Sequence, residues 1–297
     1  MNDHDESDLK HEPTLEKRVH EAYGQMPPAE RKLADLVLQF PGDLAAYSAT
    51  ELATLAGVSK AAATRFFRRI GFSSFDEARR LSREARDSGS PIYLASSDKS
   101  GASGRTDLEA FLQDEVQALQ RTLRQIDNDC MARIGRRIAG ARRVVVMGYR
   151  NSYYLAGYLR GLLVQMRQDV QLFPGPGEAP GDHLAELGPE DLLILIAMRR
   201  RRVQIPRIMQ SMHDLGVPIV LITDPTARGL PALAQETLIC ETATSFLFDT
   251  YAPSQSVLRL LAVEVSRQLG ETGRTRLQAI ENLHDDLHEL ELQITES

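Results

Sequence analysis

Residues 48–72 constrain the fold more than any other stretch, because they read as a short apolar helix, a turn and a second, amphipathic helix. Gly57 lies where the chain must turn sharply, and a glycine adopts a positive φ angle there without a steric penalty. Ser59 follows as an N-cap, since its hydroxyl can accept hydrogen bonds from the first N–H groups of the second helix. The spacing predicts a helix-turn-helix unit.

The second of these helices separates into two faces at about 100° per residue. Its apolar face suits docking on a small core and holds Ala63, Phe66, Phe67 and Ile70. Its other face is small, hydroxylated and cationic, which suits the base edges and phosphates of a major groove. We predict that double-stranded operator DNA is contacted by Thr50, Ser59, Lys60, Ala61, Thr64, Arg65 and Arg68. A generic amphipathic helix is the alternative, but the small Ala61 and Ala62 favour DNA, because bulk there would hold the backbone away from it.

The overall charge does not argue against DNA binding. The chain of 297 residues has a net charge of −6, from 35 Lys and Arg against 41 Asp and Glu. Residues 59–86, however, contain eight basic and only three acidic side chains. A local basic patch, not the whole-chain sum, decides phosphate contact.

The chain length favours two domains. We place an all-α helix-turn-helix domain at residues 13–87, a Ser- and Gly-rich linker at 88–106 and a second domain at 107–297. The second domain alternates helical stretches with five apolar, strand-sized segments, which are residues 143–148, 170–173, 191–198, 217–223 and 238–240. Such alternation predicts a parallel sheet covered by helices.

Several classes of protein are disfavoured by composition. Cys130 and Cys240 are the two cysteines, and their separation matches no metal-ligand spacing, so we expect structural thiols in a reducing compartment. Residues 1–13 are acidic and polar, as in a tail without a signal peptide. No apolar run reaches the length of a membrane span. We expect a soluble, cytoplasmic protein that binds no metal and no cofactor and has no membrane partner.

Two segments at the ends of predicted strands are candidate ligand sites, since open parallel sheets bind ligands beyond the carboxyl ends of their strands. The first follows the strand at 143–148, where Asn151 or Ser152 can cap the next helix and leave N–H groups for an anion. An ordinary βα turn is the alternative there. The second is a run of four arginines after the strand at 191–198, which can bind phosphate or carboxylate, or form a solvated or intersubunit ion-pair cluster. The predicted ligand residues are Gly148, Arg150, Asn151, Ser152, Arg199, Arg200, Arg201 and Arg202.

The helix-turn-helix stretch contains a combination of short motifs, Glu51-Leu52-Ala53, Gly57-Val58-Ser59, Thr64-Arg65-Phe66 and Arg69-Ile70-Gly71-Phe72. With these motifs and the strand that ends at Gly148, the chain resembles the RpiR (MurR/RpiR) family of bacterial transcription regulators over residues 15–269. The resemblance implies an N-terminal all-α helix-turn-helix domain and a C-terminal α/β sugar-isomerase (SIS) domain. It implies a five-stranded parallel sheet with helices on both faces, which binds a phosphorylated sugar and holds a homodimer or homotetramer together.

One segment departs from the SIS pattern. SIS domains usually have a hydroxyl- and glycine-rich loop after the third strand, whereas this chain has residues 197–202, without either. The effector is therefore open between a sugar phosphate and another small anion, such as a carboxylate metabolite. The loop at 174–183 either rims the same pocket or is a stiff surface connection, and we favour the surface connection.

The leading interpretation is a non-enzymatic regulator of a carbohydrate or organic-acid operon, with DNA affinity modulated by an anion bound to the SIS domain. One alternative is a SIS domain that only assembles subunits, with the arginine run at an interface or on the DNA backbone. Another is an aldose–ketose isomerase, for which Glu178 and His183 are the available general bases.

Overall fold

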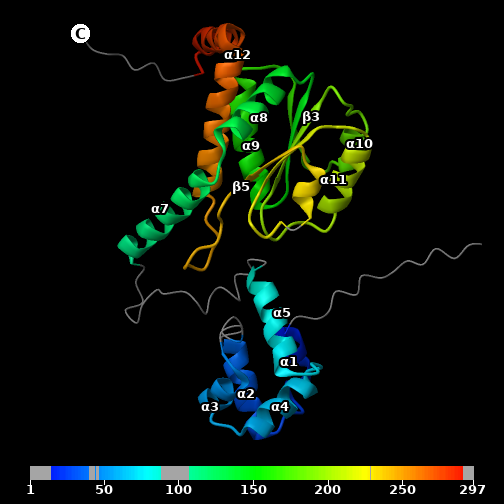
Figure 1. Cartoon of the computed structure of the whole chain (residues 1–297), viewed down its shortest axis with the longest axis vertical. Helices are drawn as coiled ribbons and strands as arrows, with labels where there is room; N and C mark the ends of the chain where they lie inside the picture. Colours follow the sequence, from blue (N-terminus) through cyan, green and yellow to red (C-terminus); the bar gives the residue numbers. More distant parts are fainter. Residues whose placement is uncertain (1–14, 40–43, 45–46, 88–106, 228, 290–297) are drawn as a thin grey trace, which may run out of the picture. The chain divides into compact units, whose positions relative to one another are not determined.

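The computed structural model describes residues 15–39, 44, 47–87, 107–227 and 229–289 (Figure 1). Helices α1–α5 belong to one compact unit, and the elements from α7 to α12 belong to a second. The tail predicted at residues 1–13 and the linker predicted at residues 88–106 lie outside the described residues.

The described residues of the first unit form the helices α1 (Leu15–Tyr23), α2 (Pro28–Gln39), α3 (Ala49–Leu55), α4 (Lys60–Arg69) and α5 (Phe75–Asp87). Their apolar faces enclose one core. Phe67 lies at its centre, with edge-to-face contacts at ring-centroid distances of 5.0 Å to Phe66 and 5.2 Å to Phe75. Aromatic pairs prefer this geometry, because the positive edge of one ring faces the negative face of the other.

The predicted helix-turn-helix is confirmed, with α3 as its first helix and α4 as its second. Gly57 has the expected positive φ of 62° between them. The Ser59 hydroxyl accepts a 3.2 Å hydrogen bond from the Ala62 backbone N–H and so caps α4. The start of α3 adds a capping box that we did not predict, in which Ser48 and Glu51 each bind the other's backbone N–H.

The second unit contains the predicted five-stranded sheet. Its strands are β1 (Val144–Gly148), β2 (Val170–Phe173), β3 (Leu192–Ala197), β4 (Ile219–Thr223) and β5 (Glu236–Ile239). They pair in the order β2-β1-β3-β4-β5, and every pair is parallel. The order reverses between β1 and β3, so these two strands flank the topological switch point where ligands bind in such sheets.

Helices cover both faces of this sheet, as predicted (Figure 1). One face packs against α8 (Asn128–Gly140), α9 (Asn151–Val164) and α12 (Ala252–Leu287), and the other against α10 (Pro180–Leu184) and α11 (Ile205–Asp214). Side chains alternate between the faces, so Val144 and Val146 join the first core and Val145 and Met147 the second. Burial on both sides explains why β1 and β3 are apolar at every position.

The helices α7 and α12 complete the second unit. α7 (Leu108–Arg124) is its first helix and contacts α12. α12 bends at Gly270, where φ is 52°, and beyond the bend Arg276 Nε donates a 2.8 Å hydrogen bond to the Val164 carbonyl. The part of α12 around Arg276 therefore packs on the end of α9.

Candidate functional site

The predicted DNA-contacting residues share one property, which is solvent exposure. They are Thr50, Ser59, Lys60, Ala61, Thr64, Arg65 and Arg68. The opposite face of α4 is buried at Ala63, Phe66, Phe67 and Ile70. Ala62 differs from our interpretation, because its side chain is only 2% exposed. Its small size serves the packing of α4 on the core, and only Ala61 presents a small side chain to the solvent.

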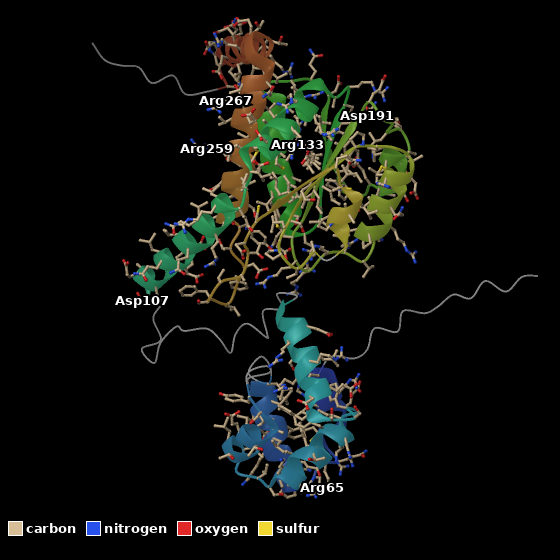
Figure 2. The ribbon with its side chains drawn as sticks, in the orientation of Figure 1. Arg65, Asp107, Arg133, Asp191, Arg259 and Arg267 are labelled. Atoms are coloured by element: carbon tan, nitrogen blue, oxygen red, sulfur yellow. The ribbon has the colours of Figure 1, made fainter. Side chains whose placement is uncertain are left out.

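Glu30 of α2 is a buried carboxylate beneath the basic side of α4. It is 3% exposed at the side chain and accepts a 2.6 Å hydrogen bond from Arg69 Nε. Its other oxygen lies 3.8 Å from the Nε atom of Arg65, which is 64% exposed and is labelled in Figure 2. Glu30 therefore holds the base of two arginine side chains while the Arg65 side chain stays largely in solvent. Sequence reasoning missed it, because nothing local distinguishes it from other first-turn acidic residues.

The two predicted ligand loops meet at the carboxyl ends of β1 and β3, which are adjacent strands. A cavity of about 30 Å³ lies between them. Its lining includes seven predicted residues, which are Arg150, Asn151, Ser152, Arg199, Arg200, Arg201 and Arg202. The remaining lining residues were not among the predicted ligand residues, and they are Tyr149, Ile196, Ala197, Met198, Ile205 and Tyr251.

Gly148 allows the first loop to pack closely against the end of β1. A Cβ atom at this position would overlap the carbonyl oxygen of Ser152 and lie 2.6 Å from its carbon, so the start of α9 approaches β1 more closely than a side chain permits. Our capping prediction was wrong, since the N-cap is Arg150, with φ of 56°, and no side chain caps α9. Ser152 Oγ instead accepts a 3.2 Å hydrogen bond from the Met198 N–H. That bond ties the first loop to the second.

The four arginines divide into two kinds. Arg199 pairs with Asp249, and Arg201 with Asp224. Arg200 is exposed, with φ of 62°, and the Arg202 guanidinium carbon lies 5.4 Å from the centroid of the Tyr149 ring. Carboxylates thus neutralise Arg199 and Arg201, whereas Arg200 and Arg202 form no ion pair among the described residues.

Both tyrosines of the cavity are neutral hydrogen-bonding groups. Burial raises the pKa of Tyr149 and that of Tyr251 above the ordinary value, so both phenols stay protonated at neutral pH. Tyr251 accepts a hydrogen bond of 3.4 Å from Asn151 Nδ2. The Tyr149 hydroxyl is buried and has no hydrogen-bond partner among the described residues. A buried hydroxyl without a partner is uncommon in folded proteins.

The cavity contains cations and neutral donors, but none of its described lining residues is Asp, Glu, His or Lys. Glu178 and His183 do not line it. Glu178 accepts a 2.6 Å hydrogen bond from the Gly175 N–H and lies 3.5 Å from His183 Nε2, on the segment that includes α10. The arrangement can bind an anion and offers no obvious general base.

Metal sites, membrane-spanning helices and reactive thiols would indicate other functions for the described part of the chain. No cluster of three or more His, Cys, Asp or Glu side chains that could hold a metal ion occurs there. Neither does any helix long and apolar enough to cross a membrane. Both cysteines are free thiols, and burial raises the pKa of Cys240 to about 12.

Comparison with known proteins identifies both units. The helix-turn-helix domain model of the rpiR family matches residues 14–87, and the SIS domain model matches residues 137–264. The chain belongs to the RpiR family of transcriptional regulators. The resemblance seen in the sequence is confirmed, as is the prediction of a SIS domain.

Relatives of this RpiR-family chain are distant but of similar length. An uncharacterized HTH-type transcriptional regulator of Thermotoga maritima is 24% identical, over 90% of this chain and 95% of its own. Another, from Providencia stuartii, is 23% identical over 71% of this chain and 74% of its own.

Solved structures share the fold at low identity. The sugar isomerase domain of an RpiR transcription factor from Sphaerobacter thermophilus is 21% identical, with a TM-score of 0.55 over 59% of this chain and 97% of that domain. Vibrio vulnificus NanR, solved in complex with ManNAc-6P, is 19% identical, with the same TM-score over 92% of this chain and 99% of its own.

Proposed function

We propose that this RpiR-family regulator binds operator DNA through α3 and α4 and changes its DNA affinity when a small anionic metabolite binds between β1 and β3. The observation that supports this most is the cavity. Two loops that are far apart in the sequence bring arginines and neutral donors together at the switch point of the sheet. Arginine forks bind phosphate and carboxylate groups in a bidentate manner.

The DNA-contacting residues are proposed from their chemistry and exposure. Lys60, Arg65 and Arg68 supply cations for phosphates and base edges, while Ala61 lets the backbone of α4 approach the groove. Thr50 and Ser59 stand at the starts of α3 and α4, where hydroxyls and N–H groups can contact phosphates.

A sugar phosphate is the first effector to test. NanR of Vibrio vulnificus was solved with ManNAc-6P, and its fold covers nearly the whole of this chain. A carboxylate metabolite is the second effector to test, because this chain has arginines where SIS domains usually have hydroxyl groups. The regulated genes would then belong to carbohydrate or organic-acid metabolism.

We propose a homodimer or homotetramer assembled through the SIS domain. α7 supports this, since it exposes the large apolar side chains of Leu108, Phe111, Leu112, Val116 and Leu123. Paired helix-turn-helix units would read half-sites about 34 Å apart, or a multiple of that distance. Light scattering of the full chain tests the assembly, and a monomer would contradict it.

Two alternatives predict different behaviour. A SIS domain used for assembly alone would leave DNA affinity unchanged by every anion. An isomerase would interconvert an aldose and a ketose phosphate, which needs a general base at the sugar carbon. The absence of any such side chain from the described lining of the cavity supports the regulator over the isomerase.

Selection of genomic fragments by the full-length protein, followed by sequencing, tests the DNA-binding part of the proposal. We expect enrichment of a two-fold symmetric site. Arg65→Ala provides the control, and enrichment of the same site by this variant with equal affinity would contradict the proposed role of α4.

A further inference from the structure

Arg199 and Asp249 form a buried ion pair beside the cavity. Arg199 Nε donates a 2.8 Å hydrogen bond to Asp249 Oδ2, and Nη2 donates to Oδ1. Their side chains are only 5% and 8% exposed, yet Arg199 itself lines the cavity. A guanidinium that holds a carboxylate with two parallel bonds can hold a ligand phosphate or carboxylate in the same way.

The neighbouring ion pair, Arg201 with Asp224, is part of a larger hydrogen-bond network. Arg201 donates to the Ala197 carbonyl, to Thr223, to Thr226 and to Asp224. Asp224 is itself held by the backbone N–H and the hydroxyl of Thr226. Among the described residues, by contrast, the Asp249 carboxylate has Arg199 as its only hydrogen-bond partner. Exchange at Arg199 therefore breaks one ion pair, whereas exchange at Arg201 would dismantle a network.

The size of the cavity requires some displacement. It measures about 30 Å³, whereas pockets for small molecules typically measure roughly 300–1,000 Å³. A metabolite can enter only if side chains that now fill the space move. Of the two ion pairs beside the cavity, the pair of Arg199 with Asp249 can separate more readily, because Asp249 has no other hydrogen-bond partner among the described residues. A ligand anion would then be the new partner of Arg199.

We propose that Asp249 is an internal counter-ion, which the anionic group of the effector replaces on Arg199. This inference rests on the proposed function, because it specifies how the ligand enters the same site. The phosphate or carboxylate of the ligand takes over both guanidinium bonds, so Arg199 never becomes a buried charge without a partner. Asp249 then leaves the site on its own loop.

The loop that holds Asp249 is attached to α7 near both of its ends. Thr250 Oγ1 donates a 2.6 Å hydrogen bond to Glu115, and the Glu241 N–H donates a 2.9 Å hydrogen bond to Thr122 Oγ1. Because Thr250 follows Asp249 directly, displacement of Asp249 pulls on the bond to Glu115. α7 begins next to Asp107, labelled in Figure 2, immediately after residues 88–106 that join the two units in sequence. The exchange thereby loosens α7, the helix through which the effector signal leaves the SIS domain.

Calorimetric titration of the full-length protein with inorganic phosphate tests the exchange. Asp249→Asn keeps the shape of the side chain but removes the competing negative charge, so we expect phosphate to bind about tenfold more tightly than to the wild type. Asp191→Asn is the matched control. Asp191, labelled in Figure 2, forms a comparable bidentate pair with Arg142, but at the amino-terminal end of β3. This variant should bind phosphate like the wild type.

Equal or weaker phosphate binding by Asp249→Asn would overturn the exchange, as would an absence of phosphate binding in both proteins. Amide hydrogen exchange of the wild type gives a readout that does not depend on the folding of a variant. Phosphate should accelerate exchange in the part of α7 around Glu115 and Thr122, and unchanged rates would contradict the link to α7.

Operator binding, measured separately, distinguishes the two proposals. Tighter phosphate binding by Asp249→Asn in a protein that binds no operator would support the counter-ion and refute the regulator. A different outcome is that phosphate and sugar phosphates change operator affinity while Asp249→Asn binds phosphate like the wild type. This result would refute the counter-ion role of Asp249 and leave the regulator proposal standing.

Discussion

Glu30 and Arg69 are joined by a 2.6 Å hydrogen bond between the buried carboxylate of α2 and the guanidinium of α4. This bond fixes the last residue of α4 to α2. Because Arg65 lies 3.8 Å from the other carboxylate oxygen, one acidic side chain supports two arginines. The position of the recognition helix therefore depends on an ion pair as well as on the phenylalanine core.

Glu30→Ala should destabilise the N-terminal unit by about 1–3 kcal/mol, because the donors of Arg69 lose their buried acceptor. Amide hydrogen exchange in α2 and α4 would measure this loss. The control is Asp76→Ala, which removes an exposed ion pair with Arg79 and should cost less than about 1 kcal/mol. Equal effects of the two substitutions would show that Glu30 does not hold α4.

Arg65→Ala should weaken operator binding while the helices of the N-terminal unit remain folded. Its side chain is 64% exposed, so little packing is lost on truncation. If Arg65 contacts a phosphate, the slope of log affinity against log salt concentration should fall by about one. Fluorescence anisotropy over a range of salt concentrations measures both quantities. Arg80→Ala on α5, which removes an exposed pair with Glu84, is the comparison. Unchanged operator affinity in Arg65→Ala would remove Arg65 from the interface.

Gly148→Ala should destabilise the SIS unit by about 1–3 kcal/mol, the usual cost of forcing a methyl group into packed structure. The new Cβ would overlap the backbone of Ser152. Gly161→Ala in α9 is the matched control, because its added methyl group meets no atom within 4 Å and alanine favours a helix. Urea unfolding followed by circular dichroism should separate the two variants. Equal stabilities would mean that the backbone at Ser152 relaxes at no cost.

Arg201→Ala and Arg200→Ala should differ sharply. Asp224 has a side chain with no solvent exposure, so removal of Arg201 leaves a buried carboxylate without its counter-ion and should cost about 3–5 kcal/mol. Arg200 is exposed and makes no ion pair within the described residues, so Arg200→Ala should leave stability intact and weaken only the response to an anion. Thermal unfolding and anion titration together check this. A stable Arg201→Ala protein would contradict the structural role of Arg201.

Local patterns were sufficient for much of this structure. The two faces of α4, the cap at Ser59 and the positive φ at Gly57 each follow from a few neighbouring residues. The meeting of residues 148–152 with residues 197–202 follows from a topological rule, because parallel strands end at the same edge. These features depend on local periodicity and on the alternation of helices and strands along the chain, which a single sequence displays.

Features that depend on distant contacts were not predictable in the same way. Asp249 lies in an irregular loop, fifty positions from its partner Arg199, and no spacing connects them. Asp224 could have been suspected, since it directly follows β4 beside the end of β3. The division of the arginine run into paired and available cations emerged only from these two carboxylates. Ala62 shows a related limit, because its burial depends on how α4 tilts against the core.

The most direct test of the regulator proposal is the affinity of the full-length protein for its selected operator, measured by fluorescence anisotropy with and without effector candidates. Inorganic phosphate, ManNAc-6P, other sugar phosphates and carboxylate metabolites form the panel. We predict that at least one of them changes operator affinity by about 5- to 150-fold, the usual range of allosteric coupling. The same compound should have a smaller effect on a variant with both Arg200→Ala and Arg202→Ala. Equal operator affinity with every compound, or an equal response of that variant, would contradict an anion-sensing cavity between β1 and β3.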